Sequence, residues 1–517
     1  MKRLRSYLPA LASGLLLVAS FPTAGLWPLA WIGLVPLLVS VRGRPSAGAF
    51  ARGWVTGLVF YLGALYWIAP TISNYTRLGL APALVLLLML SAVVALFLGL
   101  FAATVEWLAQ GGAARALVAP CVWVALEWSR TFFPAAFPWA ALGYSQQPAL
   151  AIIQIADIGA VWLVSALLVF SNGVIAETLA CGVGASRRWL VALLAAIVLD
   201  LGYGGYRLAR IEVQASSAPL TVALVQGNIA QDKKWDGDWQ QLTVDRYLAL
   251  SRRAVEAGAE FIAWPESALP VLVNDRRTQA VAEFASGHGV WLLSGAPGYE
   301  SRDGGPILAW NQAWTFDPSG GKQGPYDKIK LVPFGEYVPF GGLFGLVDKT
   351  VETVGTFGRG SKRLLFVGPR LEFGGTRGVD AVRFASLVCY EAIFPAFTRR
   401  FVADGADFLV NISNDAWYGV SSAPYQHLAM AAFRAVENRV PLLRATNTGI
   451  SAVIDSSGRV GFDTDLFVQS VVVTDIRMSP SRSVYLVVGD LFAWLCVGAT
   501  ILLLGLRLGR RRVLRAS

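Results

Sequence analysis

The stretch FASLVCYE, Phe384 to Glu391, is an apolar run that ends in a cysteine, a tyrosine and a glutamate. A short apolar run of this kind predicts a buried β-strand. Strands of α/β sheets deliver side chains from their carboxyl ends into a shared crevice, where catalytic groups gather. Cys389 is therefore a candidate reactive residue, although a cysteine at the end of a buried strand more often serves only for packing.

This run lies inside a long segment, residues 207–481, in which apolar stretches alternate with amphipathic ones. Further strands are predicted at Leu220 to Val225, Phe261 to Trp264, Val290 to Leu293, Phe408 to Ile412 and Val471 to Val473. Helices are predicted at 239–257, 275–287, 394–404 and 423–438. The alternation is typical of a layered α/β domain, and about 275 residues are enough to bury a core.

Two other polar residues of this segment stand in similar settings. Glu266 follows Phe-Ile-Ala-Trp-Pro, and Lys328 opens a predicted hairpin that leads to Glu336. Taken singly, a glutamate at a strand end is usually a cap or a surface charge, and a loop lysine is usually solvated. The joint appearance of glutamate, lysine and cysteine, each in a stiff local setting, favours a shared active site instead.

The whole chain is too apolar for a soluble domain. Of its 517 residues 55% are hydrophobic and 15% are charged, whereas charged residues usually reach about 25%. The formal charge of +10 comes from basic residues beside apolar runs, which is typical of membrane-helix anchors and disfavours nucleic acid as a partner. Four widely spaced cysteines and the histidines His288 and His427 form neither a disulfide framework nor a metal-ligand spacing. No metal or cofactor is expected, so acid–base chemistry must rest on carboxylates or lysine.

Eight apolar runs are long enough to span a bilayer as helices. They lie at 7–23, 25–41, 53–71, 80–108, 113–130, 157–180, 188–206 and 484–506. The first run also resembles a signal peptide, but the second run follows almost at once, which favours a retained hairpin. Basic residues gather in every second connection, which places both termini in the cytoplasm and 207–481 outside. The predicted domains are therefore 1–206 with the first seven spans, 207–481, and 482–517 with the last span and a basic tail.

Four short motifs surround the three candidate residues. They are Trp264-Pro265-Glu266-Ser267, Lys328 with Leu331-Val332-Pro333-Phe334-Gly335-Glu336, Cys389-Tyr390-Glu391 and Ser413-Asn414-Asp415-Ala416-Trp417. These motifs resemble the nitrilase (carbon-nitrogen hydrolase) superfamily and, within it, the apolipoprotein N-acyltransferases. Val225-Gln226-Gly227-Asn228, Phe137-Pro138-Trp139 and Gly143-Tyr144-Ser145-Gln146 extend the resemblance over essentially the whole chain. It implies a polytopic protein of the bacterial inner membrane, with an αββα sandwich inserted on the periplasmic side.

The resemblance also implies a two-step acyl transfer. A thioester on Cys389 would take its acyl chain from the sn-1 ester of a phospholipid, typically phosphatidylethanolamine. It would pass the chain to the α-amino group of the S-diacylglyceryl-cysteine of an apolipoprotein. Glu266 would be the base, and Lys328 would favour the thiolate and stabilise the oxyanion.

Several residues receive supporting roles. Glu336 would orient Lys328 or the thiol, or would form a structural salt bridge. Glu391 would shape the pocket or serve the fold, with Tyr390 beside it. Trp235 and Asn311 match family positions near the substrate. Two apolar segments, Pro339 to Phe357 and Phe132 to Tyr144, are candidate lipid entrances or ordinary core.

Two other functions remain open at this point. The same three residues would serve a membrane-anchored amidase or nitrilase in which water completes the reaction, although eight spans exceed what an anchor needs. A transporter or receptor with a ligand-binding outer domain is the other alternative. It is disfavoured because the acidic residues of the spans lie mostly toward helix ends, away from the midplane that an ion relay requires.

Overall fold

The structure, a computed structural model, describes residues 5–76, 78–112, 114–132, 136–213, 218–231, 233–234, 236–300, 308–337, 357–373, 378–479 and 482–516. Contacts divide the chain into two compact units. The helical unit comprises Met1–Leu208, Ser421–Ala429 and Val488–Ser517, and the sheet unit comprises Ala209–Val420 and Met430–Val487. Ser421–Ala429 joins the helical unit because its Gln426 donates to the carbonyl of Ala64 at 3.1 Å and accepts from the indole of Trp139 at 2.6 Å.

Two six-stranded sheets form the centre of the sheet unit. In sheet order, the first contains β12 (Ser470–Ile476), β1 (Leu220–Gln226), β2 (Phe261–Ala263), β3 (Trp291–Glu300), β4 (Leu308–Phe316) and β5 (Lys322–Asp327). The second contains β11 (Val460–Asp463), β10 (Ala452–Ile454), β9 (Leu442–Thr446), β8 (Phe408–Ser413), β7 (Gly378–Val388) and β6 (Phe366–Phe373). The central strands β1, β2 and β3 are parallel, as are β7, β8 and β9, so each sheet gathers several strand carboxyl ends at one edge.

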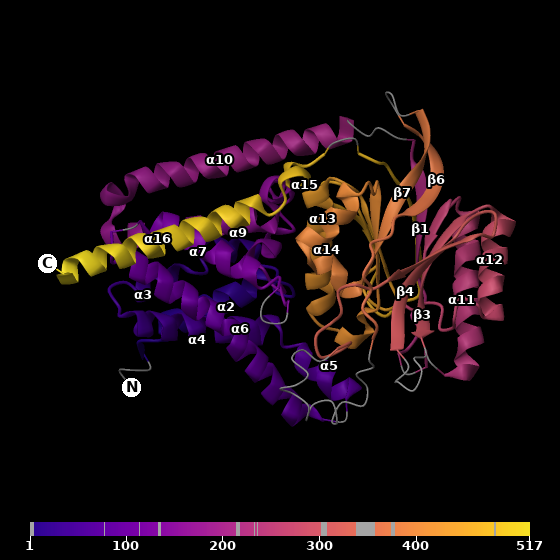
Figure 1. Ribbon diagram of the computed structural model, residues 1–517, viewed down its shortest axis with the longest axis horizontal. Coiled ribbons are helices and arrows are strands. Elements are labelled where there is room, and N and C mark those ends of the chain that lie inside the picture. The colour runs from indigo at the N-terminus through magenta and orange to yellow at the C-terminus, as the bar shows by residue number, and fades with distance from the viewer. Residues whose placement is uncertain are drawn as a thin grey trace. The chain divides into compact units, whose positions relative to one another are not determined.

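Helices cover the outer faces of both sheets, which gives the predicted αββα sandwich. Figure 1 shows α11 (Gly237–Glu256) and α12 (Arg276–His288) beside the first sheet, and α13 (Pro395–Ala403) and α14 (Ala423–Asn438) beside the second. Apolar residues of α11 and α12 share one buried cluster with β1, β2 and β3. Between the sheets the ring of Phe261 packs edge-on against those of Phe384 and Phe408, with centroids 5.0 and 5.4 Å apart.

The structure confirms the six strands and the four helices predicted within residues 207–481, with small shifts of their ends. The strands that the sequence pattern did not reveal are β4, β5, β6, β9, β10 and β11. One of them changes the setting of Lys328, which directly follows β5 rather than opening a hairpin. The turn from Lys328 to Tyr337 holds a single isolated bridge, between Pro333 and Tyr337.

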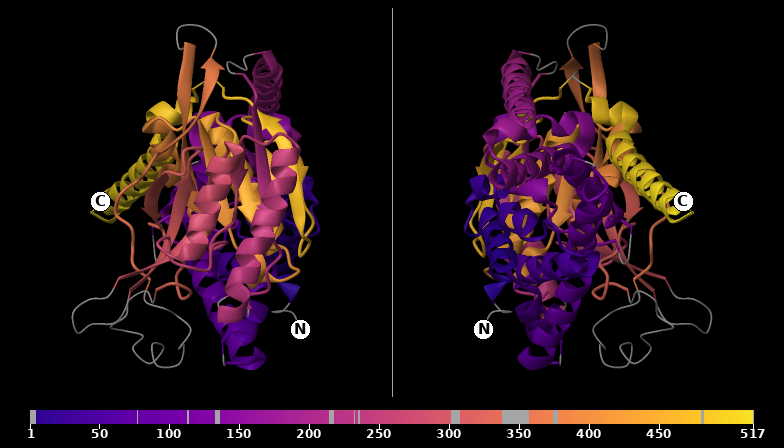
Figure 2. Two further views of the ribbon diagram at one scale, coloured as in Figure 1. Left: turned by 90° about the vertical axis from the view of Figure 1, so that its right-hand side faces the viewer. Right: turned by 90° about the vertical axis from the view of Figure 1, so that its left-hand side faces the viewer.

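The helical unit contains several long apolar helices. Its elements are α2 (Leu8–Ser20), η1 (Trp27–Trp31), α3 (Val35–Ser40), α4 (Ser46–Ala64), α5 (Ile68–Tyr75), α6 (Leu80–Ala109), α7 (Arg115–Ser129), η2 (Leu142–Gln146), α8 (Leu150–Ile153), α9 (Ala156–Cys181), α10 (Val183–Val213) and α16 (Leu491–Ala516). The short helix α15 (Val484–Val488) precedes α16. Figure 2 shows these elements from two further sides.

Four helices of the described residues are long and apolar enough to cross a bilayer: α6, α9, α10 and α16. A fifth span arises if α4 and α5, which meet at a bend of 52°, are counted as one. The apolar windows of α10 and α16 are only 17% buried, so most of their apolar surface needs a non-aqueous surrounding. The remaining predicted spans are shorter helices, and α7 also carries Pro120, which removes one backbone hydrogen bond.

Charged residues from five helices meet near one end of the helical unit. Arg42, just after α3, pairs with Glu177 of α9 at 3.1 Å, and Arg115 of α7 pairs with Glu106 of α6 at 2.7 Å. The guanidinium of Arg507 on α16 lies over the ring of Trp107, 5.4 Å from the ring centroid and so within the reach of about 6 Å for a cation–π contact. Arg42, Arg115 and Arg507 thus lie at the same end, as expected if they anchor one face of a membrane protein.

Candidate active site

The strand β7 ends at Val388, and Cys389 directly after it begins the 3-10 helix η3 (Cys389–Ile393). The φ of Cys389 is +50°, in the left-handed region that residues with a Cβ rarely adopt. Backbone strain of this kind costs about 1–3 kcal/mol and clusters at functional sites. Cys389 is only 6% exposed, so little of it is accessible from solvent.

The strand β2 ends two residues before Pro265 and Glu266, and the chain turns sharply there because Ser267 has a φ of +50°. Gly295 of β3 lies against this turn: a Cβ at that position would lie 2.4 Å from the nitrogen of Ser267. The carboxylate of Glu266 accepts from the side-chain amide of Asn311 at 2.6 Å and from the main-chain N–H of Asn414 at 2.9 Å. Glu266 is therefore held from both sheets.

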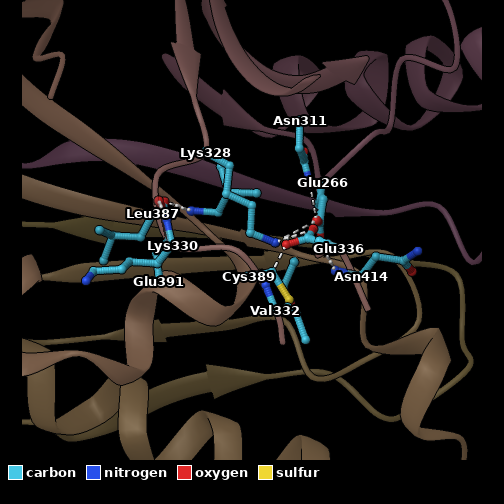
Figure 3. Close-up of polar contacts among 12 residues, drawn as sticks. Glu266, Asn311, Lys328, Lys330, Val332, Glu336, Leu387, Cys389, Glu391 and Asn414 are labelled. Carbon is cyan, nitrogen blue, oxygen red and sulfur yellow. Dashed lines mark hydrogen bonds and ion pairs between the residues drawn. The ribbon is translucent and has the colours of Figure 1, made fainter. Parts of the chain in front are cut away.

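Lys328 is 1% exposed and lies between two carboxylates. Its Nζ is 2.7 Å from Oε1 of Glu336 and 3.7 Å from Oε1 of Glu266 (Figure 3). Burial disfavours the ammonium, but Glu336, Glu266 and Cys389 outweigh it and raise the pKa of Lys328. Lys328 therefore stays charged, and Glu336 is its ion-pair partner, with the other oxygen accepting from the N–H of Val332 at 2.8 Å.

The electrostatics of the thiol follow from these neighbours. Burial raises the pKa of Cys389 to about 12, and the Glu266 carboxylate adds to the effect, whereas Lys328 opposes it. The resting site thus contains a neutral Cys389 thiol beside the Glu266 carboxylate and the Lys328 ammonium. Such an arrangement can form the nucleophile by passing the thiol proton to Glu266 as the attack begins.

Glu391 has a different setting although it lies only two residues after Cys389. Its carboxylate accepts from the hydroxyl of Tyr326 at 2.8 Å and from the N–H groups of Ile329, Lys330 and Val388 at 2.7, 3.0 and 2.8 Å. Glu391 therefore ties the turn after Lys328 to the turn that carries Cys389. Among the two roles that the sequence leaves open, this geometry corresponds to the structural one.

Further polar residues support the thiol from the second sheet. The guanidinium of Arg444 on β9 donates to Asp415 at 2.6 Å and to Asn411, whose amide donates to the carbonyl of Leu387 at 2.9 Å. The hydroxyl of Ser413 donates to Asp415 at 2.8 Å and also interacts with the thiol of Cys389. The Ser-Asn-Asp motif was the sequence signal for this network, but the partner Arg444 had none.

The remaining predicted residues have separate outcomes. Asn311 lies against Glu266, which it holds, and the ring of Tyr390 packs edge-on on Phe394 at 5.2 Å. His427 belongs to the helical unit, where its ring lies 5.7 Å from that of Trp139. Trp235 and residues 339–356 of the first apolar segment lie outside the described residues, as do 133–135 of the second. Within the described part of the chain no group of three side chains could hold a metal ion.

Comparisons with known proteins identify the family of this chain. Residues 13–174 match the family model of the apolipoprotein N-acyltransferase N-terminal domain, and residues 221–485 match that of carbon-nitrogen hydrolase. Apolipoprotein N-acyltransferase of Geobacter metallireducens is 40% identical over 98% of this chain and 96% of that protein. Those of Azotobacter vinelandii and Chlorobaculum tepidum are 34% and 31% identical over 98% and 95% of this chain, and over 96% and 94% of theirs.

Among solved structures, a variant of an amidase of the nitrilase superfamily from Nesterenkonia AN1 matches with a TM-score of 0.37 and 22% identity. It covers 51% of this chain and 92% of the amidase. The family assignment depends on the sequence relatives, which extend over nearly the full length of this chain. The chain belongs to the apolipoprotein N-acyltransferase family and carries a carbon-nitrogen hydrolase domain.

Proposed function

We propose that this N-acyltransferase moves a fatty acyl chain from the sn-1 ester of a phospholipid, phosphatidylethanolamine in the first instance, through a thioester on Cys389. The acceptor is the α-amino group of the S-diacylglyceryl-cysteine at an apolipoprotein N-terminus. The observation that carries the proposal is that Glu266, Lys328 and Cys389 lie close enough to influence one another electrostatically. The relatives of this chain are named apolipoprotein N-acyltransferases.

In the first step the thiol proton of Cys389 passes to the carboxylate of Glu266 while the sulfur attacks the ester carbonyl carbon. The carbonyl oxygen becomes an oxyanion, and the buried ammonium of Lys328 stabilises it. The tetrahedral adduct collapses with cleavage of the ester C–O bond. The leaving glycerol oxygen takes the proton from Glu266 and departs as lysophospholipid, which leaves a thioester.

In the second step the α-amino group of the acceptor attacks the thioester carbon and gives a proton to Glu266. The C–S bond breaks, and the departing sulfur receives that proton, so the resting thiol is restored. The amide keeps the acyl chain. A thioester suits this sequence because it reacts readily with amines and divides one difficult transfer into two easier steps.

The same geometry explains why both cationic and anionic groups are needed around one sulfur. A thiol whose pKa is about 12 would be nearly inert at neutral pH without a neighbouring base. Lys328 alone would lower that pKa, but its charge is shared with Glu336 at 2.7 Å. Its strongest effect is therefore expected on the oxyanion, which exists only after the attack.

We also propose that the enzyme crosses a bacterial inner membrane eight times, with both termini in the cytoplasm and residues 207–481 in the periplasm. Support comes from four span-length helices and from Arg42, Arg115 and Arg507 at a common end of the helical unit. Both substrates carry lipid tails, so a membrane location would keep the acyl chains in hydrocarbon while ester and amine reach the sulfur.

A single-turnover experiment with the purified full chain tests this function. We expect intact-protein mass spectrometry to show one acyl adduct on Cys389 after mixing with phosphatidylethanolamine, and its loss after addition of a diacylglyceryl peptide, which becomes acylated. Cys389→Ala should form no adduct and transfer nothing. Hydrolysis of small amides without any peptide acylation would establish the amidase alternative, and full function of Cys389→Ala would establish the binding-protein alternative.

A further inference from the structure

Lys234 is a buried amine that has no part in the chemistry described above. It is 2% exposed, and its Nζ donates to the main-chain carbonyl of Glu266 at 2.9 Å. The adjacent Lys233 is exposed and lies over the ring of Trp239 at 4.4 Å. Burying an ammonium is expensive, and one bond to a neutral carbonyl compensates for little of that cost. The position of Lys234 therefore calls for a functional explanation.

The fold brings Lys234 to Glu266 through neighbouring parallel strands. Lys234 lies between β1 and α11, and Glu266 follows β2, whose Ala263 pairs with Leu224 of β1. The same segment carries Gln231, which accepts from the side-chain amide of Asn414 at 2.6 Å. Since the N–H of Asn414 donates to the Glu266 carboxylate, the Gln231–Lys234 segment holds Glu266 both at its backbone and, indirectly, at its side chain.

We propose that Lys234 is a positioning residue for the base: its ammonium fixes the Glu266–Ser267 turn through the Glu266 carbonyl and adds a positive charge beside the active site. This inference rests on the proposed role of Glu266. It assigns to the second lysine of Lys233-Lys234 a task distinct from that of Lys328, which faces the reacting atoms.

Removing Lys234 would change the balance of charge around the Glu266 carboxylate. Lys328 and Lys234 are the cations near its carboxylate, and Glu336, Asp415, Cys389 and Tyr418 are the acidic or neutral groups of the same neighbourhood. Burial lowers the pKa of Lys234 to about 8, and the Glu266 carboxylate opposes the shift. Lys234 is thus a cation at neutral pH, and its removal withdraws one positive charge from beside the Glu266 carboxylate.

The test compares Lys234→Met with two matched controls in the full-length enzyme. Lys233→Met removes the adjacent exposed charge, and Lys322→Met removes a lysine that also donates to a carbonyl, that of Val273 at 3.0 Å. The measurement is the single-turnover rate of adduct formation on Cys389 from phosphatidylethanolamine across pH 5 to pH 9. We expect Lys234→Met to lose about a hundredfold in rate, as for a misplaced base, and its acid limb to move to higher pH.

Two further variants separate charge from structure. Lys234→Arg should recover part of the rate and the original acid limb because it keeps a cation. Lys234→Gln, which retains a donor but no charge, should lose less rate than Lys234→Met yet show the shifted limb, and it replaces Lys234→Met if that variant does not fold. A rate and pH profile of Lys234→Gln equal to those of the two control variants would overturn the inference.

Glu266→Gln distinguishes this failure from a failure of the proposed function. If Glu266→Gln is inactive while the Lys234 variants behave as the controls, only the positioning role is wrong. If Glu266→Gln forms the adduct at the wild-type rate, the base assignment itself is wrong, and with it the inference about Lys234.

Discussion

Glu266 and Glu391 are both buried carboxylates near Cys389, yet their surroundings differ. Among the described residues Glu391 accepts from a tyrosine hydroxyl and three main-chain N–H groups, so its oxygens are fully occupied. Glu266 accepts from one amide side chain and one N–H, and its ammonium neighbour is 3.7 Å away. The Glu391 carboxylate therefore fixes the chain, whereas Glu266 makes fewer hydrogen bonds to the described residues and can accept the thiol proton.

The largest expected effect is on Glu266. Glu266→Gln keeps the shape of the side chain but removes the base, so adduct formation on Cys389 should fall by at least about a thousandfold. The folded state should persist, because the amide oxygen still accepts from Asn311 or Asn414. The measurement is the single-turnover mass assay, with thermal unfolding as the control. A large loss of stability with a modest loss of rate would reverse the comparison.

The next effect concerns the thiol itself. Since burial and Glu266 raise the pKa of Cys389 to about 12, its alkylation by iodoacetamide should increase about tenfold per pH unit up to about pH 10, without a plateau. Removing the negative charge lowers that pKa, so Glu266→Gln should be alkylated faster at about pH 9.5 while it transfers more slowly. Peptide mapping isolates Cys389 from the other three cysteines. A plateau below about pH 9 would contradict the prediction.

Glu391→Gln should show the opposite pattern from Glu266→Gln. The new amide group faces donors instead of accepting from them, which should lower the free energy of unfolding by about 2–3 kcal/mol. Molecules that remain folded should still form the adduct. Tyr326→Phe removes a single donor and should cost about 1 kcal/mol. Both values are measured by thermal unfolding in one detergent. Equal effects of the two variants would mean that the main-chain N–H groups add nothing to the stabilising role of Glu391.

The smallest effect is expected at Ser413, which interacts with the thiol and donates to Asp415. Ser413→Ala should slow adduct formation about threefold to tenfold, the range of one hydrogen bond. Ser386 on β7 is a suitable control because its buried hydroxyl has no hydrogen-bond partner among the described residues. Ser386→Ala should leave the rate unchanged. Equal rates for both variants would mean that the hydrogen bonds of Ser413 do not contribute to the reaction.

Much of the sandwich could be predicted from the sequence because its central strands are short, apolar and bounded by polar segments. β5 was missed because its Lys-Gln-Gly-Pro-Tyr-Asp sequence lacks apolar alternation and lies at a sheet edge. The contacts of Glu391 were out of reach because two of its donors, Ile329 and Lys330, are about sixty positions earlier in the chain. Lys233 and Lys234 are adjacent lysines, so the sequence does not show that Lys234 is buried and Lys233 is exposed.

The site is divided between two layers, since Glu266 and Lys328 follow strands of one sheet and Cys389 follows a strand of the other. The gap between base and sulfur is therefore set by how Phe261 packs against Phe384 and Phe408, well inside the sandwich. Replacing one of these rings by a smaller side chain would allow the two sheets to shift relative to each other. The rate of the reaction should then fall under conditions in which the domain is still folded. The reaction rate of this protein should therefore depend on how closely the two sheets pack.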